Sequence, residues 1–472
     1  MIISRQRLFF RAFLTLTFLF ILSAGLKAQK TEPAAEVQKG KTPIIIIPGL
    51  TGSELVNKRT GSVVWFQKSR AKDDDIRLPI SPVLARNRDN LVAGDIIRHV
   101  QILKFLPETE IYEKLLSSLE KRGGYREGKW EAPPADGHQD TFYVFAYDWR
   151  RDNVENARLL VRKIDALKVR LKKPRLKFNI IAHSMGGLIA RYAAMYGDRD
   201  LPPGPPRPNW DGARNFKRIF LLGTPNEGSV KSFEAALNGF SYIGGGINLP
   251  FIQNISRFDI FTLPSIYQLL PHRGTFRVYD ENLQPLDIDL FDPKVWDMYD
   301  WNVINDENFK KAFSPREVRS AKAYFRTVLA RAEKFHEALN ANTRRSIPVS
   351  FYLIGGDCKE TPDAVILYRD KKKNKWKTQF GAGAFERENG EKVSAEEVKK
   401  LIYALGDGVV SKRSLAGETL AGNGKKAFLP VTSDVYLCEG HTKLVTSAAA
   451  QDKLFALLLG EASEQTTAET EK

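Results

Sequence analysis

The chain has 472 residues, a formal net charge of +16 and two cysteines. Its hydrophobic content of 43% excludes a wholly disordered chain, and two cysteines are too few for a disulfide-rich scaffold. The basic residues are scattered and accompany no nucleic-acid-binding motif, so we expect no nucleic-acid partner, although a basic surface would suit an anionic lipid surface.

Residues 1–28 resemble an export signal. Arg5, Arg7 and Arg11 precede an almost wholly apolar run from 12 to 25, and Leu26-Lys27-Ala28 is typical of a cleavage site. The apolar run is shorter than the roughly 20 residues that span a bilayer, and an uncleaved anchor is the alternative. The sequence therefore predicts an exported protein, periplasmic or secreted, with membrane association left open.

Apolar runs and amphipathic segments alternate along the rest of the chain. This alternation predicts an α/β protein with a mostly parallel sheet and helices on both faces. We expect strands at 42–48, 141–147, 176–181, 216–222 and 347–354, and helices at 110–121, 154–171, 188–195, 315–339 and 442–459.

The domain organisation follows from the lengths of the connections. One domain is expected over 42–460, with insertions at about 58–106 and 226–345. The second insertion is much longer than an ordinary connection between two strands, so we expect it to form a cap. Residues 201–208 and 370–392 are predicted to be loops only, and 461–472 a disordered tail.

The strongest motif is Ala182-His183-Ser184-Met185-Gly186-Gly187, which follows a predicted strand and opens a helix. This is the pattern of a nucleophile elbow, which presents a serine at a strand tip, so Ser184 is the candidate nucleophile. The usual first glycine is Ala182 here.

An oxyanion hole needs backbone N–H groups beside the serine. The glycine-containing loop 48–53 follows the first strand, and we expect Leu50 and Met185 to supply the two N–H groups, with Thr51 as the alternative to Leu50.

The acid and the base should follow the serine in that order. Of the six histidines, His441 alone lies in a late loop before the last predicted helix, so it is the candidate base. Asp407 lies on a glycine-flanked turn before it and is the preferred acid, with Asp357 as the rival.

The two cysteines, Cys358 and Cys438, lie near these loops. In an exported protein an even pair favours one disulfide, and two free thiols are the alternative.

Six motifs occur in a fixed order that resembles the lecithin:cholesterol acyltransferase family of α/β-hydrolases, together with its lysosomal phospholipase and phospholipid:diacylglycerol acyltransferase relatives. They are Pro48-Gly49-Leu50-Thr51-Gly52-Ser53, Tyr147-Asp148-Trp149-Arg150, Ala182-His183-Ser184-Met185-Gly186-Gly187, Gly223-Thr224-Pro225, Leu263-Pro264-Ser265-Ile266-Tyr267-Gln268-Leu269-Leu270-Pro271 and Gly406-Asp407-Gly408-Val409-Val410.

The resemblance implies an α/β-hydrolase fold with a cap and an acyl-Ser184 intermediate, drawn from a glycerophospholipid at a lipid surface and passed to a sterol, another alcohol or water. It implies the triad named above and supports a Cys358–Cys438 pair. The implied reaction requires no metal or other cofactor. It also implies that 58–106 is a membrane-docking subdomain and that 239–251 is a lid. A neutral lipase or carboxylesterase, and a lipid-binding relative without turnover, are the alternatives.

Overall fold

The structure, a computed structural model, describes residues 40–66, 75–100, 109–240, 255–342, 346–370, 374–418, 429 and 431–460. The predicted signal at 1–28, the tail at 461–472 and most of the predicted lid lie outside the described residues.

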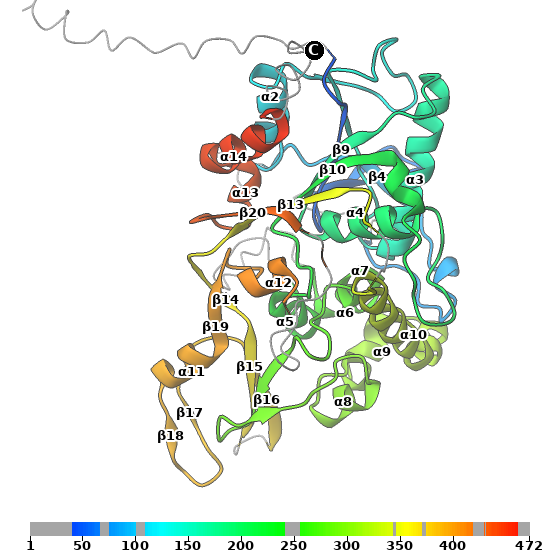
Figure 1. Ribbon diagram of the computed structural model, residues 1–472. Coiled ribbons are helices and arrows are strands. Elements are labelled where there is room, and N and C mark those ends of the chain that lie inside the picture. The colour runs from blue at the N-terminus through cyan, green and yellow to red at the C-terminus, as the bar shows by residue number, and fades with distance from the viewer. Residues whose placement is uncertain are drawn as a thin grey trace, which may run out of the picture. The chain divides into compact units, whose positions relative to one another are not determined.

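A seven-stranded sheet forms the centre of the described chain, in the order β20-β13-β10-β9-β1-β8-β7 (Figure 1). Every neighbouring pair in this sheet is parallel. Strands covered on both faces have continuous apolar sequences rather than alternating ones, which is why they are predictable. The strands are β1 (Ile44–Ile47), β7 (Arg126–Glu127), β8 (Thr141–Val144), β9 (Phe178–His183), β10 (Phe216–Leu222), β13 (Ser350–Gly356) and β20 (Val431–Leu437).

Helices cover both faces of this sheet, and strand β1 shows how its alternating side chains divide between them. Ile44 and Ile46 belong to the core cluster that includes buried residues of α2 (Glu113–Lys121) and α14 (Ala448–Leu459). Ile45 and Ile47 belong to the cluster with α3 (Asn153–Arg170) and α4 (Met185–Tyr196). Figure 1 shows these two pairs of helices on opposite sides of the strands. The predicted α/β-hydrolase fold class is confirmed.

The helix predicted over 442–459 is in fact two helices, α13 (Lys443–Thr446) and α14. Ser447 interrupts it with an extended backbone, and its side chain accepts a hydrogen bond from the Ala450 N–H at 3.1 Å. Serine favours this capping role because its hydroxyl satisfies an N–H group at the start of a helix.

Two strands of the first insertion, β3 (Val63–Trp65) and β4 (Leu91–Ile96), pair antiparallel with β2 (Ser53–Asn57), which precedes this insertion, and form a small sheet. Trp65 is fully buried, and its Nε1 donates to the Thr51 carbonyl at 2.9 Å. Trp65 is therefore part of the core rather than a side chain offered to a lipid surface. The other elements here are η1 (Leu84–Arg86), β5 (His99–Val100) and β6 (Thr109–Glu110).

The Asp148-Trp149-Arg150 segment has a structural role, as an ion pair beneath this insertion. Arg150 is fully buried and bonds Asp148 at 2.8 Å and Asp89 at 2.5 Å. Trp149 Nε1 donates to the Ser53 carbonyl at 3.1 Å. These contacts hold the insertion against the strand end.

Among the described residues between β10 and β13, helices predominate over strands. The long helix α10 (Pro315–Leu339) begins at a capping box in which Ser314 and Glu317 bond each other's backbone, as the sequence predicts. Phe335 of α10 packs against Tyr192 of α4 with ring centroids 5.8 Å apart. The remaining elements are η2 (Asp211–Asn215) before β10, then α5 (Val230–Asn238), α6 (Arg257–Phe261), α7 (Pro264–Tyr267), β11 (Arg277–Tyr279), β12 (Pro285–Leu286), α8 (Pro293–Met298), η3 (Val303–Asn305) and α9 (Phe309–Ala312).

The prediction that 370–392 contains loops only is wrong. Strand β15 (Ala364–Asp370) pairs antiparallel with β16 (Lys375–Gln379), and β17 (Phe385–Glu386) pairs with β18 (Lys392–Val393). A small separate core of Ile366, Phe385, Val393, Val398 and Ile402 supports these strands. Pairing with neighbours, rather than local periodicity, creates them. The other elements of this region are β14 (Lys359–Pro362), α11 (Ala395–Ile402), β19 (Tyr403–Gly406) and α12 (Lys412–Ala416).

Candidate active site

Ser184 occupies the tight turn between β9 and α4. Its backbone has φ 53° and ψ −126°, a conformation rarely adopted by residues with a side chain. The Ser184 N–H donates to the Leu222 carbonyl at 2.8 Å, which ties the turn to the neighbouring strand. The serine is half-buried. Strand, strained serine and helix follow one another as in a nucleophile elbow.

His441 approaches Ser184 from a loop near the other end of the chain, between β20 and α13. Its Nε2 lies 2.9 Å from Ser184 Oγ, and its Nδ1 lies 2.7 Å from Asp407 Oδ2. The His441 N–H also donates to the Asp407 carbonyl at 2.9 Å, so the two loops are joined through their backbones. A hydroxyl, an imidazole and a carboxylate bonded in series can carry out nucleophilic attack on an ester.

The Asp407 carboxylate is buried and strongly hydrogen-bonded. Its Oδ1 accepts from the N–H groups of Val409 at 2.9 Å and Val410 at 2.7 Å. Burial alone would raise the pKa of Asp407, but the attraction and hydrogen bond of His441, with these two N–H groups, hold that pKa below its ordinary value. Asp407 is therefore charged at neutral pH and suited to orient the imidazole.

The rival acid, Asp357, lies just after β13, where its N–H donates to the Leu437 carbonyl at 3.2 Å. The carboxylate bonded to His441 belongs to Asp407. Cys358 and Cys438 form a disulfide, with Cα atoms 5.0 Å apart. This bond joins the segments after β13 and β20 and therefore restrains the loop that carries His441.

The loop after β1 passes directly beside the serine. A Cβ atom placed on Gly49 would lie 2.9 Å from Ser184 Cβ. Within the described ranges, neither the Leu50 N–H nor the Met185 N–H donates to a protein acceptor. Met185 opens α4, where N–H groups have no partner inside the helix. Thr51, the alternative donor, has φ 61° and its Oγ1 donates to the Leu50 carbonyl at 2.6 Å.

Two side chains behind the serine were not predicted from the sequence. The Tyr112 hydroxyl lies 2.8 Å from His183 Nδ1 and also accepts from the Gly49 N–H at 2.8 Å. His183 Nε2 lies 3.2 Å from the His441 carbonyl. Because His183 precedes Ser184, the order of the triad excludes it as a base, and nothing local marks Tyr112, which starts a helix elsewhere.

The other two histidines of the C-terminal two-thirds, His272 and His336, make their contacts with residues other than the three triad candidates. His272 Nε2 lies 2.5 Å from the buried carboxylate of Glu227, and Asn340 Nδ2 donates to the same oxygen at 3.1 Å. His336 is buried in α10 beside His272, with ring centroids 4.9 Å apart. These contacts join separate segments of the second insertion to one another.

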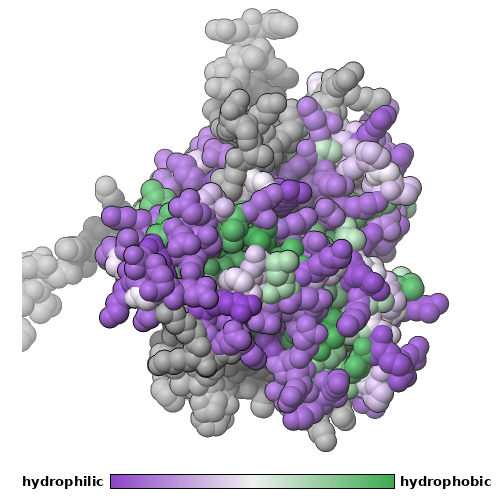
Figure 2. Space-filling view, turned by 90° about the horizontal axis from the view of Figure 1, so that it is seen from below, coloured by the Kyte–Doolittle hydropathy of each residue, from purple (hydrophilic) through white to green (hydrophobic). Residues whose placement is uncertain are grey.

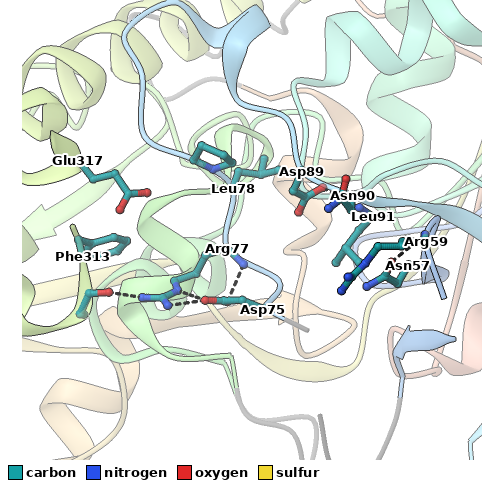
Figure 3. A pocket seen from close by; sticks show the side chains of 12 residues that line it. Asn57, Arg59, Asp75, Arg77, Leu78, Asp89, Asn90, Leu91, Phe313 and Glu317 are labelled. Atoms are coloured by element: carbon teal, nitrogen blue, oxygen red, sulfur yellow. Dashed lines mark hydrogen bonds and ion pairs between the residues drawn. The ribbon is translucent and has the colours of Figure 1, made fainter. Parts of the chain in front are cut away.

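A cavity of about 260 Å³ lies between the first insertion and the start of α10 (Figure 3). Figure 3 shows Arg77 directed toward Asp75, whose carboxylate it binds, with Glu317 and Phe313 nearby. Charged side chains line it, and none of the three triad candidates does, so it does not suit a fatty acyl chain. The lining residues are Asn57, Arg59, Asp75, Arg77, Leu78, Pro79, Asp89, Asn90, Leu91, Ala312, Phe313 and Glu317.

The surface offers limited apolar area in the view of Figure 2, where hydrophobic residues gather in small areas of a largely hydrophilic face. Among the described residues, the exposed large hydrophobic side chains are Val83, Val169, Met298 and Leu405. Leu405 is 60% exposed and lies two positions before Asp407. No helix in the described ranges is both long enough and apolar enough to cross a bilayer. The same ranges contain no cluster of three metal-ligating side chains.

Comparisons with known proteins identify the family of this chain. The sequence model of the lecithin:cholesterol acyltransferase family matches residues 106–416, which include Ser184 and Asp407 and end before His441. "Lecithin-cholesterol acyltransferase-like 4" of Arabidopsis thaliana is 23% identical over 276 residues, which are 53% of this chain and 46% of that protein. The match thus spans about half the length of that relative.

A chain in one solved complex shares the fold. The Tle4–Tli4 complex has a chain with a TM-score of 0.50 and 16% identity, covering 89% of this chain and 98% of that one. The comparison with the mature lipase BlEst2 of Bacillus licheniformis gives a TM-score of 0.34 and 12% identity, and it covers 90% of this chain and 96% of that one.

Proposed function

Because the chain belongs to the lecithin:cholesterol acyltransferase family, we propose that it is an exported, serine-dependent acyltransferase or phospholipase acting on glycerophospholipid esters. The series of hydrogen bonds from Ser184 through His441 to Asp407, at 2.9 and 2.7 Å, carries this proposal. A purely lipid-binding relative would have no use for such a series.

The proposed chemistry begins when Ser184 Oγ attacks the ester carbonyl while His441 Nε2 takes the hydroxyl proton. Asp407 keeps the other ring proton on Nδ1 and stabilises the imidazolium. The N–H groups of Leu50 and Met185 would bind the oxyanion. The imidazolium then returns its proton to the leaving alcohol, which leaves an acyl-Ser184 ester.

The second half of the reaction decides between hydrolase and transferase. His441 removes a proton from water or from an acceptor alcohol, whose oxygen attacks the acyl-enzyme and releases a fatty acid or a new ester. The outcome depends on how well the site excludes water. A neutral lipase would use the same residues on esters without a charged headgroup.

The test uses a phospholipid with a labelled acyl chain in vesicles, with and without a sterol or another alcohol. Labelled free fatty acid alone identifies a hydrolase, and a labelled new ester identifies a transferase. We expect Ser184→Ala to abolish both products and Asp407→Asn to lower kcat by about 10⁴-fold. Asp357→Asn is the matched control and should keep near-normal activity. Turnover that survives Ser184→Ala would refute the proposal.

Export remains part of this proposal. Residues 1–28 have the charge and hydropathy of a signal, and the Cys358–Cys438 disulfide suits an oxidising compartment. Sequencing the N-terminus of protein recovered from outside the cytoplasm tests it, and a mature chain that begins near residue 29 is expected. Residues 58–106 and 239–251 are the proposed docking subdomain and lid.

A further inference from the structure

One chain of hydrogen bonds links the oxyanion loop to the segment that carries the base. It runs from the Gly49 N–H to the Tyr112 hydroxyl, from Tyr112 to His183 Nδ1, and from His183 Nε2 to the His441 carbonyl, at 2.8, 2.8 and 3.2 Å. Tyr112 is 2% exposed and His183 is 7% exposed, so water does not compete strongly for these bonds.

We propose that Tyr112 and His183 are positioning residues that hold the oxyanion loop and the His441 backbone in register with Ser184. The inference rests on the proposed function, because register matters only if Ser184 is a nucleophile. Neither side chain is assigned a contact with the substrate.

The direction of every bond in this chain is fixed by chemistry. The Gly49 N–H can only donate and the His441 carbonyl can only accept, so the Tyr112 oxygen accepts from Gly49 and His183 Nε2 must carry a proton. Burial, then repulsion from His441, lowers the pKa of His183 to about 3, so its ring is neutral and carries one proton. Because this single proton lies on Nε2, Nδ1 has a lone pair and accepts from the Tyr112 hydroxyl.

Removing the Tyr112 hydroxyl would break the chain at both ends. The buried Gly49 N–H would lose its acceptor, which loosens the loop that carries the Leu50 N–H. His183 Nδ1 would lose its donor and be left buried with an unpaired lone pair, so the ring would no longer be held in place. A ring that shifts would weaken the Nε2 bond to the His441 carbonyl and so move the base, whose ring lies 4.8 Å from that of His183.

The kinetic test measures kcat and KM on a soluble p-nitrophenyl ester. We expect Tyr112→Phe to lower kcat by about ten- to a hundredfold and to leave KM within about twofold, because misplacement affects the transition state more than binding. Tyr125→Phe is the matched control, since it removes another buried hydroxyl, one that donates to the Thr42 carbonyl at 3.3 Å. It should leave kcat unchanged.

Variants of His183 separate positioning from packing. The amide of His183→Gln can accept from Tyr112 and donate to the His441 carbonyl, so activity should be largely retained, whereas His183→Leu should lose as much as Tyr112→Phe. The double variant should be no worse than His183→Leu, because both changes break one chain. The proposal would be overturned if the losses of kcat from Tyr112→Phe and His183→Leu multiplied in the double variant. It would also be overturned if His183→Gln were impaired, or if kcat of Tyr112→Phe lay within twofold of the wild-type value.

A second measurement does not need turnover. It uses nuclear magnetic resonance of Ser184→Ala protein with ¹⁵N-labelled histidines, in which the His183→Gln variant assigns the His183 signals. The His183 ring should be neutral, with its proton on Nε2, down to about pH 4. Adding Tyr112→Phe should change the ¹⁵N signals of both His183 and His441. A proton on Nδ1, or protonation near pH 6, would overturn the relay. Wild-type protein without Ser184-dependent turnover would instead refute the proposed function, and these spectra would still decide the relay.

Discussion

Gly223 gives the sharpest test of the Asp407–His441 hydrogen bond without changing either residue. It follows β10 with φ +57°, and a Cβ atom there would lie 3.0 Å from Asp407 Oδ2 and 3.1 Å from His441 Nδ1. Both separations are shorter than ordinary carbon contacts, so the methyl group of Gly223→Ala must push the two partners apart. It would press on the 2.7 Å bond that orients the base.

Two effects of Gly223→Ala can be estimated separately. The left-handed backbone should lower the free energy of unfolding by about 1–2 kcal/mol. Displacement of the imidazole by a fraction of an ångström to one ångström should lower kcat by about a hundredfold, which corresponds to about 2.7 kcal/mol of transition-state stabilisation.

Gly408→Ala is the matched control. Gly408 also has a left-handed backbone, at φ +90°, and lies next to Asp407, but a Cβ atom there would have nothing within 4 Å. It should therefore lose comparable stability and keep kcat within about threefold. The assay compares kcat on a p-nitrophenyl ester with urea unfolding of each variant. If folded Gly223→Ala keeps more than a third of the activity, or if both variants lose activity equally, the steric reasoning is wrong.

Three further predictions concern stability, each measured by urea unfolding. Arg150→Met should lower the free energy of unfolding by about 3–5 kcal/mol, because it leaves Asp148 buried without its partner; a loss below about 1 kcal/mol would contradict this. Because the pKa of His183 is about 3 when folded and about 6.5 when unfolded, the unfolded chain binds the extra proton between these values. Stability should therefore fall with acidification, by about 1.6 kcal/mol from pH 6.5 to 5 for this group, and His183→Gln should remove that share; an unchanged pH slope argues against a buried neutral ring. Replacing Cys358 and Cys438 together by serine should lower stability by up to about 4.5 kcal/mol, given a sequence separation of 80, and an unaffected variant would show that the bond constrains little.

The sheet was predictable because its signals are local. Strands buried on both faces need apolar residues throughout, so β10 has the bounds that its sequence predicts, and the elbow around Ser184 is marked by its own neighbours. The strand predicted at 141–147 ends earlier, at Val144 in β8. The Phe145 N–H still donates to the Ile46 carbonyl of β1 at 2.8 Å, but the Tyr147 N–H donates to the Ser53 side chain at 3.2 Å instead of to a strand backbone.

The parts that sequence could not supply depend on distant partners. Strands β16 and β17 contain Lys, Gln and Glu and exist because β15 and β18 pair with them. Tyr112 reaches His183 across 71 positions of sequence, and no spacing rule connects a tyrosine at a helix start to a histidine beside a serine. The direction of backbone N–H groups such as that of Leu50 is likewise set by the folded loop.

Residues 363–402, the long connection between β14 and β19, precede Asp407 without displacing this candidate catalytic residue. Strand β14 pairs with β19 from Lys359 opposite Gly406 to Pro362 opposite Tyr403, so the chain leaves and returns at one place, whatever lies between. The Cys358–Cys438 bond anchors the start of this hairpin to the β20 end, and the His441 N–H binds the Asp407 carbonyl. Because these three restraints all lie at the base of the insertion, residues 363–402 can vary in shape while the carboxylate stays beside the imidazole.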